Sequence, residues 1–214
     1  MPVQIILACI GAYLIGAIPS SVWVGKIFYG KDVRLYGSGN AGATNTFRVL
    51  GAPAGIIVLA MDILKGILAV LLAYFFHREN FSASQFLYFQ IGLGLAAGLG
   101  HIFPIYLNFT GGKGVATFFG VILWLFPLTA LICIMSFFIV FIITHYVSLS
   151  SMVASVAFTV SLFLLYPKNM HERTLIIFGV LIPIIIFYTH RKNIQRLLKG
   201  AETKMYFSKK ENPS

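Results

Sequence analysis

Long, continuous apolar segments constrain this chain more than any other feature of its sequence. They are unbroken runs of Leu, Ile, Val and Phe, and 58% of the 214 residues are hydrophobic whereas only 10% are charged. Soluble domains carry about 25% charged residues, and a soluble fold could not bury this much apolar surface. The runs also lack the short alternating strands of a membrane β-barrel. We therefore predict an all-α polytopic membrane protein that forms a single domain over residues 1–214.

The distribution of charge between the apolar segments predicts seven transmembrane helices. Basic residues mark the cytoplasmic side of a span, and they follow the first segment, residues 5–28, and fill the tail after His190. The N-terminus is therefore expected outside and the C-terminus in the cytoplasm, with the first segment retained because no basic residue precedes it. Pro19 is expected to kink the first span, and Pro127 to divide residues 115–146 into two spans. The other spans are expected at 53–76, 86–99, 152–166 and up to 188, with external links at 77–84 and 168–173.

Three polar segments interrupt this apolar pattern, and the predicted topology places all of them on the cytoplasmic side. They are Gly37–Arg48, His101–Thr117 and His190–Glu202, called here the first, second and third polar segments. Each contains glycines or amides, hydroxyl groups and at least one cation. The formal charge of +10 also suits an anionic substrate, although part of it reflects orientation and lipid head groups. We predict that the three segments form one anion-binding site.

The first polar segment reads Gly-Ser-Gly-Asn-Ala-Gly-Ala-Thr-Asn-Thr-Phe-Arg from Gly37 to Arg48. Glycines allow successive backbone N–H groups to turn toward one point, and such a concavity binds anions. A helix is expected from Ala43 to Leu50, and its free N–H groups would face the same point. The alternative is a flexible loop without a ligand. The candidate binding side chains are Ser38, Asn40, Thr44, Asn45 and Arg48.

The second polar segment contains Gly111-Gly-Lys-Gly114 directly before an apolar helix expected to begin near Val115. It resembles a phosphate loop but is not a P-loop, because Leu107 replaces a glycine and Gly114 replaces the Ser or Thr that would bind magnesium. Lys113 is the natural phosphate partner, although a cation here also signals topology. His101 is either a catalytic base or a hydrogen-bonded structural residue.

The third polar segment is predicted to be an amphipathic helix that leaves the bilayer. His190 and Asn193 lie three residues apart on one face and are best placed to reach the site, while Arg196 and Lys199 are expected to meet lipid head groups. The alternative for the whole helix is a membrane-surface anchor. Ser148, at the end of a neighbouring span, is a further candidate contact.

Acidic residues and cysteines suggest neither a metal nor a cofactor. The six acids are scattered without the spacing of a two-metal site, and Cys9 and Cys133 lie inside apolar runs. Asp62 and Lys65 lie three apart on one helix face within the second span. Ionisable groups at that depth are functional candidates, and a neutralising structural pair is the alternative.

The three polar segments together resemble the signature motifs of a bacterial membrane family, the glycerol-3-phosphate acyltransferases that use acyl-phosphate. The resemblance covers nearly the whole chain in order and length, and departs from the commonest pattern at Thr110 and Lys192. It implies transfer of an acyl group from acyl-phosphate to the 1-hydroxyl of glycerol 3-phosphate, the first acylation of phospholipid synthesis. It also implies a multi-pass protein of the bacterial cytoplasmic (inner) membrane, lipid contact, no nucleic acid, and a functional partner that makes acyl-phosphate.

Under this resemblance the candidate residues take distinct roles, with Ser38, His101 and Asn193 as the catalytic candidates. No His-x4-Asp motif follows any histidine, and no partnered nucleophilic serine is evident, so we expect direct transfer without an acyl-enzyme. The main rival function is an organic-phosphate transporter. Phosphate groups are assigned to Ser38, Thr44, Arg48 and Lys113 with the Gly111–Gly112 backbone, and orientation of the acyl carbonyl or hydroxyls to Asn40, Asn45 and Asn193, with Ser148 and His190 as further contacts.

Overall fold

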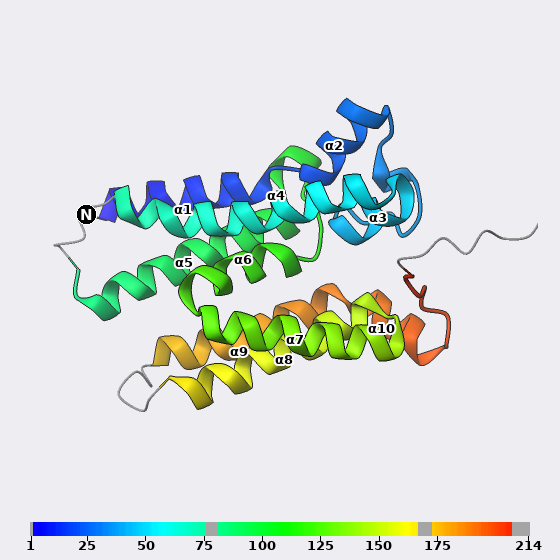
Figure 1. The fold of residues 1–214 in the computed structure, drawn as a ribbon. Helices are drawn as coiled ribbons and strands as arrows, with labels where there is room; N and C mark the ends of the chain where they lie inside the picture. The colour runs from blue at the N-terminus through cyan, green and yellow to red at the C-terminus, as the bar shows by residue number, and fades with distance from the viewer. Residues whose placement is uncertain (1, 76–80, 167–172, 207–214) are drawn as a thin grey trace, which may run out of the picture. The chain divides into compact units, whose positions relative to one another are not determined.

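The computed structural model describes residues 2–75, 81–166 and 173–206, and every regular element in these ranges is a helix (Figure 1). The all-α prediction is thereby confirmed for the described part of the chain. Contacts divide the chain into two compact units, 1–127 and 128–214. The expected external links lie mostly outside the described residues, at 77–80 and 168–172. The single domain over 1–214 stays a prediction.

The described residues of the first unit form six α-helices and three 3₁₀ helices. Figure 1 shows α1 running beside α5, and α4 packs against α6 along its length. Gly66 of α4 and Gly120 of α6 permit this close crossing, because a Cβ atom at either position would collide with the backbone of the other helix. The elements are α1 (Pro2–Ala17), α2 (Ser20–Tyr29), η1 (Val33–Leu35), α3 (Ala43–Leu50), α4 (Ala52–Leu71), η2 (Leu72–Phe75), α5 (Ala83–Ile102), η4 (Ile105–Leu107) and α6 (Val115–Leu125).

The predicted kink at Pro19 separates α1 from α2, whose axes differ by 41°. Proline has no N–H group to donate and disfavours a helical conformation in the residue before it. The helix therefore ends at Ala17, and the carbonyl group of Ile18 is released from the helical hydrogen-bond pattern. That carbonyl becomes available to a side chain of another helix, Lys65, as described below.

The second unit contains α7 (Pro127–Thr144), α8 (Val147–Leu165), α9 (Arg173–Thr189) and α10 (Arg191–Leu198). α8 and α9 pack together through the edge-to-face pair of Phe158 and Phe178, whose ring centroids lie 5.4 Å apart. Thr159 also donates a hydrogen bond of 2.6 Å to the carbonyl group of Gly179 across this interface. The chain bends by 63° between α9 and α10.

Among the described residues, four helices are long and apolar enough to cross a membrane, and up to six if each bent pair is counted as one span. The division of residues 115–146 at Pro127 is confirmed, since α6 ends at Leu125 and α7 begins at Pro127. α6 has only 11 residues and covers about 17 Å at 1.5 Å per residue, so it falls below this length criterion. The total of seven spans and the orientation of the termini stay predictions.

Candidate functional site

The loop of residues 36–42, called here the first loop, joins η1 to α3 within the first polar segment. Gly37 and Gly39 have φ angles of +60° and +70°, a left-handed conformation that side chains other than glycine rarely adopt. α3 then begins at Ala43, as the sequence predicts. Ser38 lies between the two left-handed glycines on an exposed turn, and Arg48 lies half-buried on the last turn of α3.

Asn45 fastens the first loop from the start of α3, with only 1% of its surface exposed. Its amide nitrogen donates to the carbonyl groups of Val33, at 2.7 Å, and Tyr36, at 3.2 Å. Its amide oxygen accepts from the backbone N–H group and the hydroxyl group of Ser38, at 2.8 and 3.1 Å. Both ends of the amide are thus used within the loop, and the position of Ser38 depends on Asn45.

Asp32 begins η1 and holds the entry to the first loop. Its carboxylate accepts hydrogen bonds from the backbone and guanidinium group of Arg34, the shortest of 2.7 Å, and pairs with Lys26 at 3.4 Å. The hydrogen bond from the Arg34 side chain lowers the pKa of the Asp32 carboxyl far below its ordinary value, against a smaller opposing effect of burial. Asp32 is therefore ionised at neutral pH.

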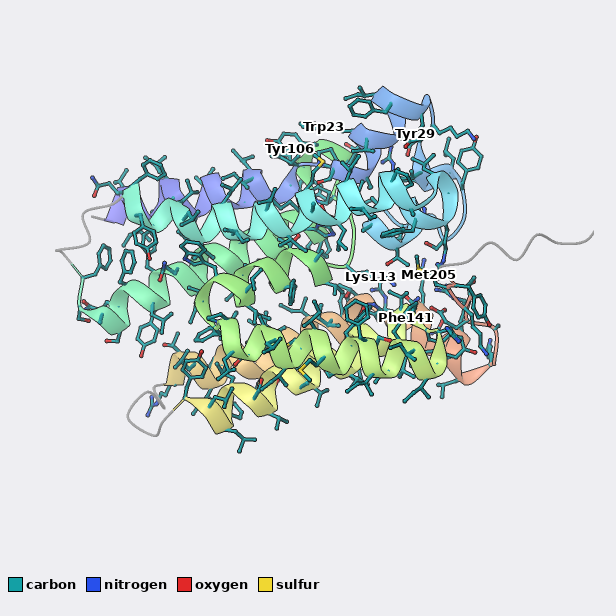
Figure 2. All side chains as sticks on the ribbon, viewed as in Figure 1. Trp23, Tyr29, Tyr106, Lys113, Phe141 and Met205 are labelled. Carbon is teal, nitrogen blue, oxygen red and sulfur yellow. The ribbon has the colours of Figure 1, made fainter. Side chains whose placement is uncertain are left out.

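The loop of residues 103–114, called here the second loop, joins α5 to α6. It folds back on the end of α5, where the N–H groups of Gly111 and Gly112 donate to the carbonyl groups of Ile102 and His101 at 3.1 and 3.0 Å. Gly114 has a φ angle of +82° and α6 begins at the next residue, Val115, as predicted. Lys113, labelled in Figure 2, is half-buried at this start of α6.

The two loops meet within the first unit. The carbonyl oxygen of Ala41, in the first loop, lies 3.0 Å from the position that a Cβ atom would take at Gly112 in the second loop. Ala41, Gly111 and Gly112 also line one small cavity of about 10 Å³, which is about the size needed for one water molecule. The structure therefore brings the glycine-rich parts of the first and second polar segments into contact, as the sequence predicts.

A buried polar network lines the same cavity. Lys65 and Asp62 form an ion pair of 2.9 Å, and Asp62 also accepts a hydrogen bond of 2.9 Å from the hydroxyl group of Ser20. Nδ1 of His101 lies 3.2 Å from the hydroxyl oxygen of Thr117 and 3.8 Å from the Asp62 carboxylate. The Asp62–Lys65 pair that the sequence singles out is thus a direct ion pair.

In the second unit, Glu202 accepts hydrogen bonds from three side chains, one on α8 and two on α10. Its Oε1 atom accepts from Ser148 at 2.7 Å and from Asn193 at 2.6 Å, and its Oε2 atom accepts from Arg196 at 2.7 Å. Burial would raise the pKa of the Glu202 carboxyl, but these hydrogen bonds and the Arg196 charge together lower the pKa below its ordinary value. Glu202 is therefore ionised at neutral pH, and its carboxylate holds these three side chains in place.

The structure corrects two expectations for this segment. The amphipathic helix α10 ends at Leu198 rather than continuing to Glu202, because Gly200 adopts a φ angle of +66° and the chain turns back. Arg196 pairs with Glu202 instead of extending only toward lipid head groups. His190 lies buried at the α9–α10 bend with its Nδ1 atom 2.8 Å from the carbonyl oxygen of Ile186.

The candidate residues therefore fall into two groups, and the predicted meeting of all three polar segments stays a prediction. The sequence analysis assigned no role to Glu202, although it is the only acid of the third polar segment, which is rich in cations. Among the described residues, no group of three or more His, Cys, Asp or Glu side chains could hold a metal ion. The first unit contains Ser38, Asn40, Thr44, Asn45, Arg48, His101, Gly111, Gly112 and Lys113, and the second contains Ser148, His190 and Asn193.

Comparison with known proteins places this geometry in a family context. The glycerol-3-phosphate acyltransferase family matches residues 6–200. A glycerol-3-phosphate acyltransferase of Enterococcus faecalis is 44% identical over 209 residues, covering 95% of this chain and 93% of that protein. One from Staphylococcus carnosus is 41% identical over 203 residues, covering 94% of this chain and 98% of the relative.

Two solved structures share the fold. One is PlsY, an integral membrane glycerol 3-phosphate acyltransferase, in its glycerol 3-phosphate form, with a TM-score of 0.81, 35% identity, and coverage of 94% of this chain and 96% of that one. The other is its lysophosphatidic acid form, with a TM-score of 0.79, 34% identity, and coverage of 95% and 96%. The likeness extends over both units of the chain.

Proposed function

The chain belongs to the glycerol-3-phosphate acyltransferase family, and we propose that it transfers an acyl group from acyl-phosphate to the 1-hydroxyl group of sn-glycerol 3-phosphate. The products are lysophosphatidate and inorganic phosphate. The reaction takes place at the cytoplasmic face of the bacterial inner membrane and is the first acylation of phospholipid synthesis. A separate enzyme that makes acyl-phosphate supplies the donor.

One observation carries the choice of acceptor and product. The solved structures that align with nearly the whole chain are named for a glycerol 3-phosphate form and a lysophosphatidic acid form of the relative. These two molecules differ by one acyl group, so that relative binds both ends of an acylation. The identity of 34 to 35% over 94 to 95% of this chain supports the same acceptor and product here.

The two loops of the first unit provide the groups that a phosphate monoester requires. Arg48 follows the first loop and Lys113 lies in the second, and the loops touch at Ala41 and Gly112. A cation that donates a hydrogen bond to a phosphate oxygen makes a stronger bond than a neutral donor. We assign phosphate binding to Arg48 and Lys113, supported by Thr44. The N–H groups of Gly111 and Gly112 donate to the carbonyl groups of Ile102 and His101, so we assign these glycines the shape of the second loop rather than a direct phosphate contact. The hydroxyl group of Ser38 donates to Asn45 and would have to turn away from it to donate to a phosphate oxygen.

The amides take more than one role in this proposal. Asn45 uses its amide within the first loop, so we assign it the support of Ser38 rather than a direct substrate contact. Asn40 retains its assignment to substrate orientation. In the second unit, Glu202 holds Asn193 and Ser148 in place, and these two with His190 are assigned to orientation of the reacting groups.

Acyl-phosphate is already activated, so positioning and charge stabilisation carry most of the catalysis. The 1-hydroxyl oxygen of glycerol 3-phosphate attacks the acyl carbonyl carbon, and a new C–O ester bond forms. The C–O bond to phosphate then breaks, and inorganic phosphate leaves with the bonding electron pair. A substrate phosphate oxygen accepts the hydroxyl proton, which completes the balance without a protein base or an acyl-enzyme.

His101 is assigned a structural role within this mechanism. Only 7% of its surface is exposed, its backbone carbonyl accepts the N–H group of Gly112, and its ring packs against the same glycine. A general base must reach the proton that it removes within hydrogen-bond distance or through one water. The second loop covers the ring, so we assign His101 the support of that loop rather than removal of the proton from the 1-hydroxyl group of glycerol 3-phosphate.

The test is an assay of the purified chain with labelled glycerol 3-phosphate and each donor in a separate reaction. We expect lysophosphatidate with acyl-phosphate and none with acyl-CoA. Product with acyl-CoA would overturn the donor assignment, and a trapped acylated protein formed from acyl-phosphate alone would overturn direct transfer. Uptake of glycerol 3-phosphate into proteoliposomes without acylation would instead favour the organic-phosphate transporter.

A further inference from the structure

Asp62 and Lys65 are ionisable residues inside α4, a helix long and apolar enough to cross the membrane, and only 2% and 4% of their surfaces are exposed. Charged groups at this depth are costly and are usually kept for a purpose. A buried ion pair is also weak evidence for stability, since apolar residues of similar volume often replace one without loss. The contacts of this pair therefore need a different explanation.

The pair joins α4 to the break between α1 and α2. Lys65 donates a hydrogen bond of 3.1 Å to the carbonyl oxygen of Ile18, which the break at Pro19 has released from the helical pattern. Asp62 accepts the hydroxyl group of Ser20, the first residue of α2, at 2.9 Å. The two charges thus fix the end of α1 and the start of α2 against one side of α4.

The same network reaches the second loop through His101. Nδ1 of His101 lies 3.8 Å from the Asp62 carboxylate and 3.2 Å from the hydroxyl oxygen of Thr117 on α6. On its other edge, Nε2 of the ring packs against Gly112 so closely that a Cβ atom there would collide with it. The ring is therefore held between α4 and α6 on one side and the second loop on the other.

One small cavity is lined both by residues of this network and by residues of the two loops. Ser20, Asp62, Lys65 and His101 line it together with Ala41, Gly111 and Gly112. Both loops thus border the same cavity as the buried charges. A shift of the His101 ring would change the position of Gly112 and of the adjacent Lys113 relative to the first loop.

We propose that Asp62, Lys65 and Thr117 are positioning residues that hold the His101 ring under Gly112 and so set the phosphate-binding arrangement of the two loops. The inference rests on the proposed function, because it assigns the phosphate group to these loops. It extends that function to three buried residues on α4 and α6, which act through His101. Their removal should raise the KM for glycerol 3-phosphate and change the melting temperature little.

Thr117 offers the sharpest test, because valine has nearly the same shape. Thr117→Val removes the hydroxyl group beside His101, whereas Thr117→Ser retains it. A lost hydrogen bond between neutral groups corresponds to a change of about two- to tenfold, so the KM for glycerol 3-phosphate should rise by that factor in Thr117→Val. Thr117→Ser should keep a KM close to that of the wild type.

A second variant tests whether the buried ion pair affects the KM or only the stability of the fold. Asp62→Leu/Lys65→Met removes both buried charges at once, and we expect a melting temperature within a few degrees of the wild type with a KM raised about tenfold or more. Gln90→Leu is the matched control, because Gln90 is also buried on α5 and its amide nitrogen has no hydrogen-bond partner in the described residues. This control should change neither quantity.

The assay uses the purified full-length chain, acyl-phosphate and varied concentrations of glycerol 3-phosphate, with thermal unfolding measured on the same samples. An unchanged KM in Thr117→Val overturns the inference, as does a double variant that loses stability while its folded fraction keeps the wild-type KM. In both cases an active wild type leaves the proposed function standing. A wild type without acyl transfer overturns the proposed function and this inference with it.

Discussion

Replacement of Asn45 by alanine tests how the first loop is built. Two of its four hydrogen bonds are short, at 2.7 Å to Val33 and 2.8 Å to the N–H group of Ser38, and only 1% of the surface of Asn45 is exposed. A net hydrogen bond contributes about 0.5–1.5 kcal/mol, and a buried partner left unpaired costs about 1–3 kcal/mol. We expect Asn45→Ala to lower the free energy of unfolding by about 2–4 kcal/mol.

The expected change in KM depends on how much of this free energy is lost from the binding arrangement of the loop rather than from the rest of the fold. If half of it does, about 1–2 kcal/mol, the fraction of molecules with the loop in its binding arrangement falls and the KM for glycerol 3-phosphate rises about fivefold to thirtyfold. Thermal unfolding of the purified protein and initial rates at varied glycerol 3-phosphate measure the two effects. Asn45→Asp keeps the shape and the acceptor but loses both donors, and should resemble the alanine variant.

Thr46 provides the matched control for this experiment. It is the next residue on α3, is fully buried, and makes one long hydrogen bond of 3.2 Å to the carbonyl group of Gly42. Thr46→Val should cost about 1 kcal/mol or less and leave the KM unchanged. A wild-type melting temperature and KM in Asn45→Ala, or an equal rise of KM in Thr46→Val, would refute the assignment of Asn45 as the residue that organises the loop.

Three further predictions concern other residues. Glu202→Gln places an amide donor opposite Arg196 and should lower the free energy of unfolding by about 1–2 kcal/mol. Because the pKa of Glu202 is lowered below 4.5, the carboxylate stabilises the fold above that pH and the advantage of the wild type should shrink on acidification, measured as melting temperature against pH. Asp32→Asn should cost less than about 1 kcal/mol because its ion pairs lie near the surface, and this difference should begin to shrink below about pH 3.9 and be lost only as the pH falls through the lowered pKa of the folded state. Gly114→Ala should cost about 1–2 kcal/mol for its left-handed conformation and should raise the KM for glycerol 3-phosphate in the rate assay.

Local signals predicted the parts of the fold that depend on near neighbours in the chain. The glycines before Ala43 and Val115 marked the starts of α3 and α6, and Pro19 and Pro127 marked the breaks. In each case the conformational restriction belongs to the residue itself or to the residue beside it. These positions could be read without knowledge of the tertiary structure.

Contacts between distant residues were beyond the same reasoning. Glu202 meets Ser148 across 54 positions of sequence, and Asp62 meets Ser20 across 42. Asn40 and Asn45 are the same residue type in the same polar segment, yet it is Asn45 that donates to the carbonyl group of Val33 and holds the first loop. Hydrogen-bonding capacity is visible in the sequence, but the fold decides whether that capacity is used by the protein or left for a ligand.

Equilibrium binding of labelled glycerol 3-phosphate tests the central claim, that the two loops of the first unit hold its phosphate group. The comparison is between the purified wild type, Arg48→Ala and Lys113→Ala, with Lys31→Ala as a control for an exposed cation outside the loops. A hydrogen bond from a charged group contributes about 1.5–3 kcal/mol, so Arg48→Ala and Lys113→Ala should each raise the Kd about tenfold to 150-fold. Lys31→Ala should leave the Kd unchanged. A wild-type Kd in both Arg48→Ala and Lys113→Ala, or an equal loss of affinity in all three variants, would contradict the account.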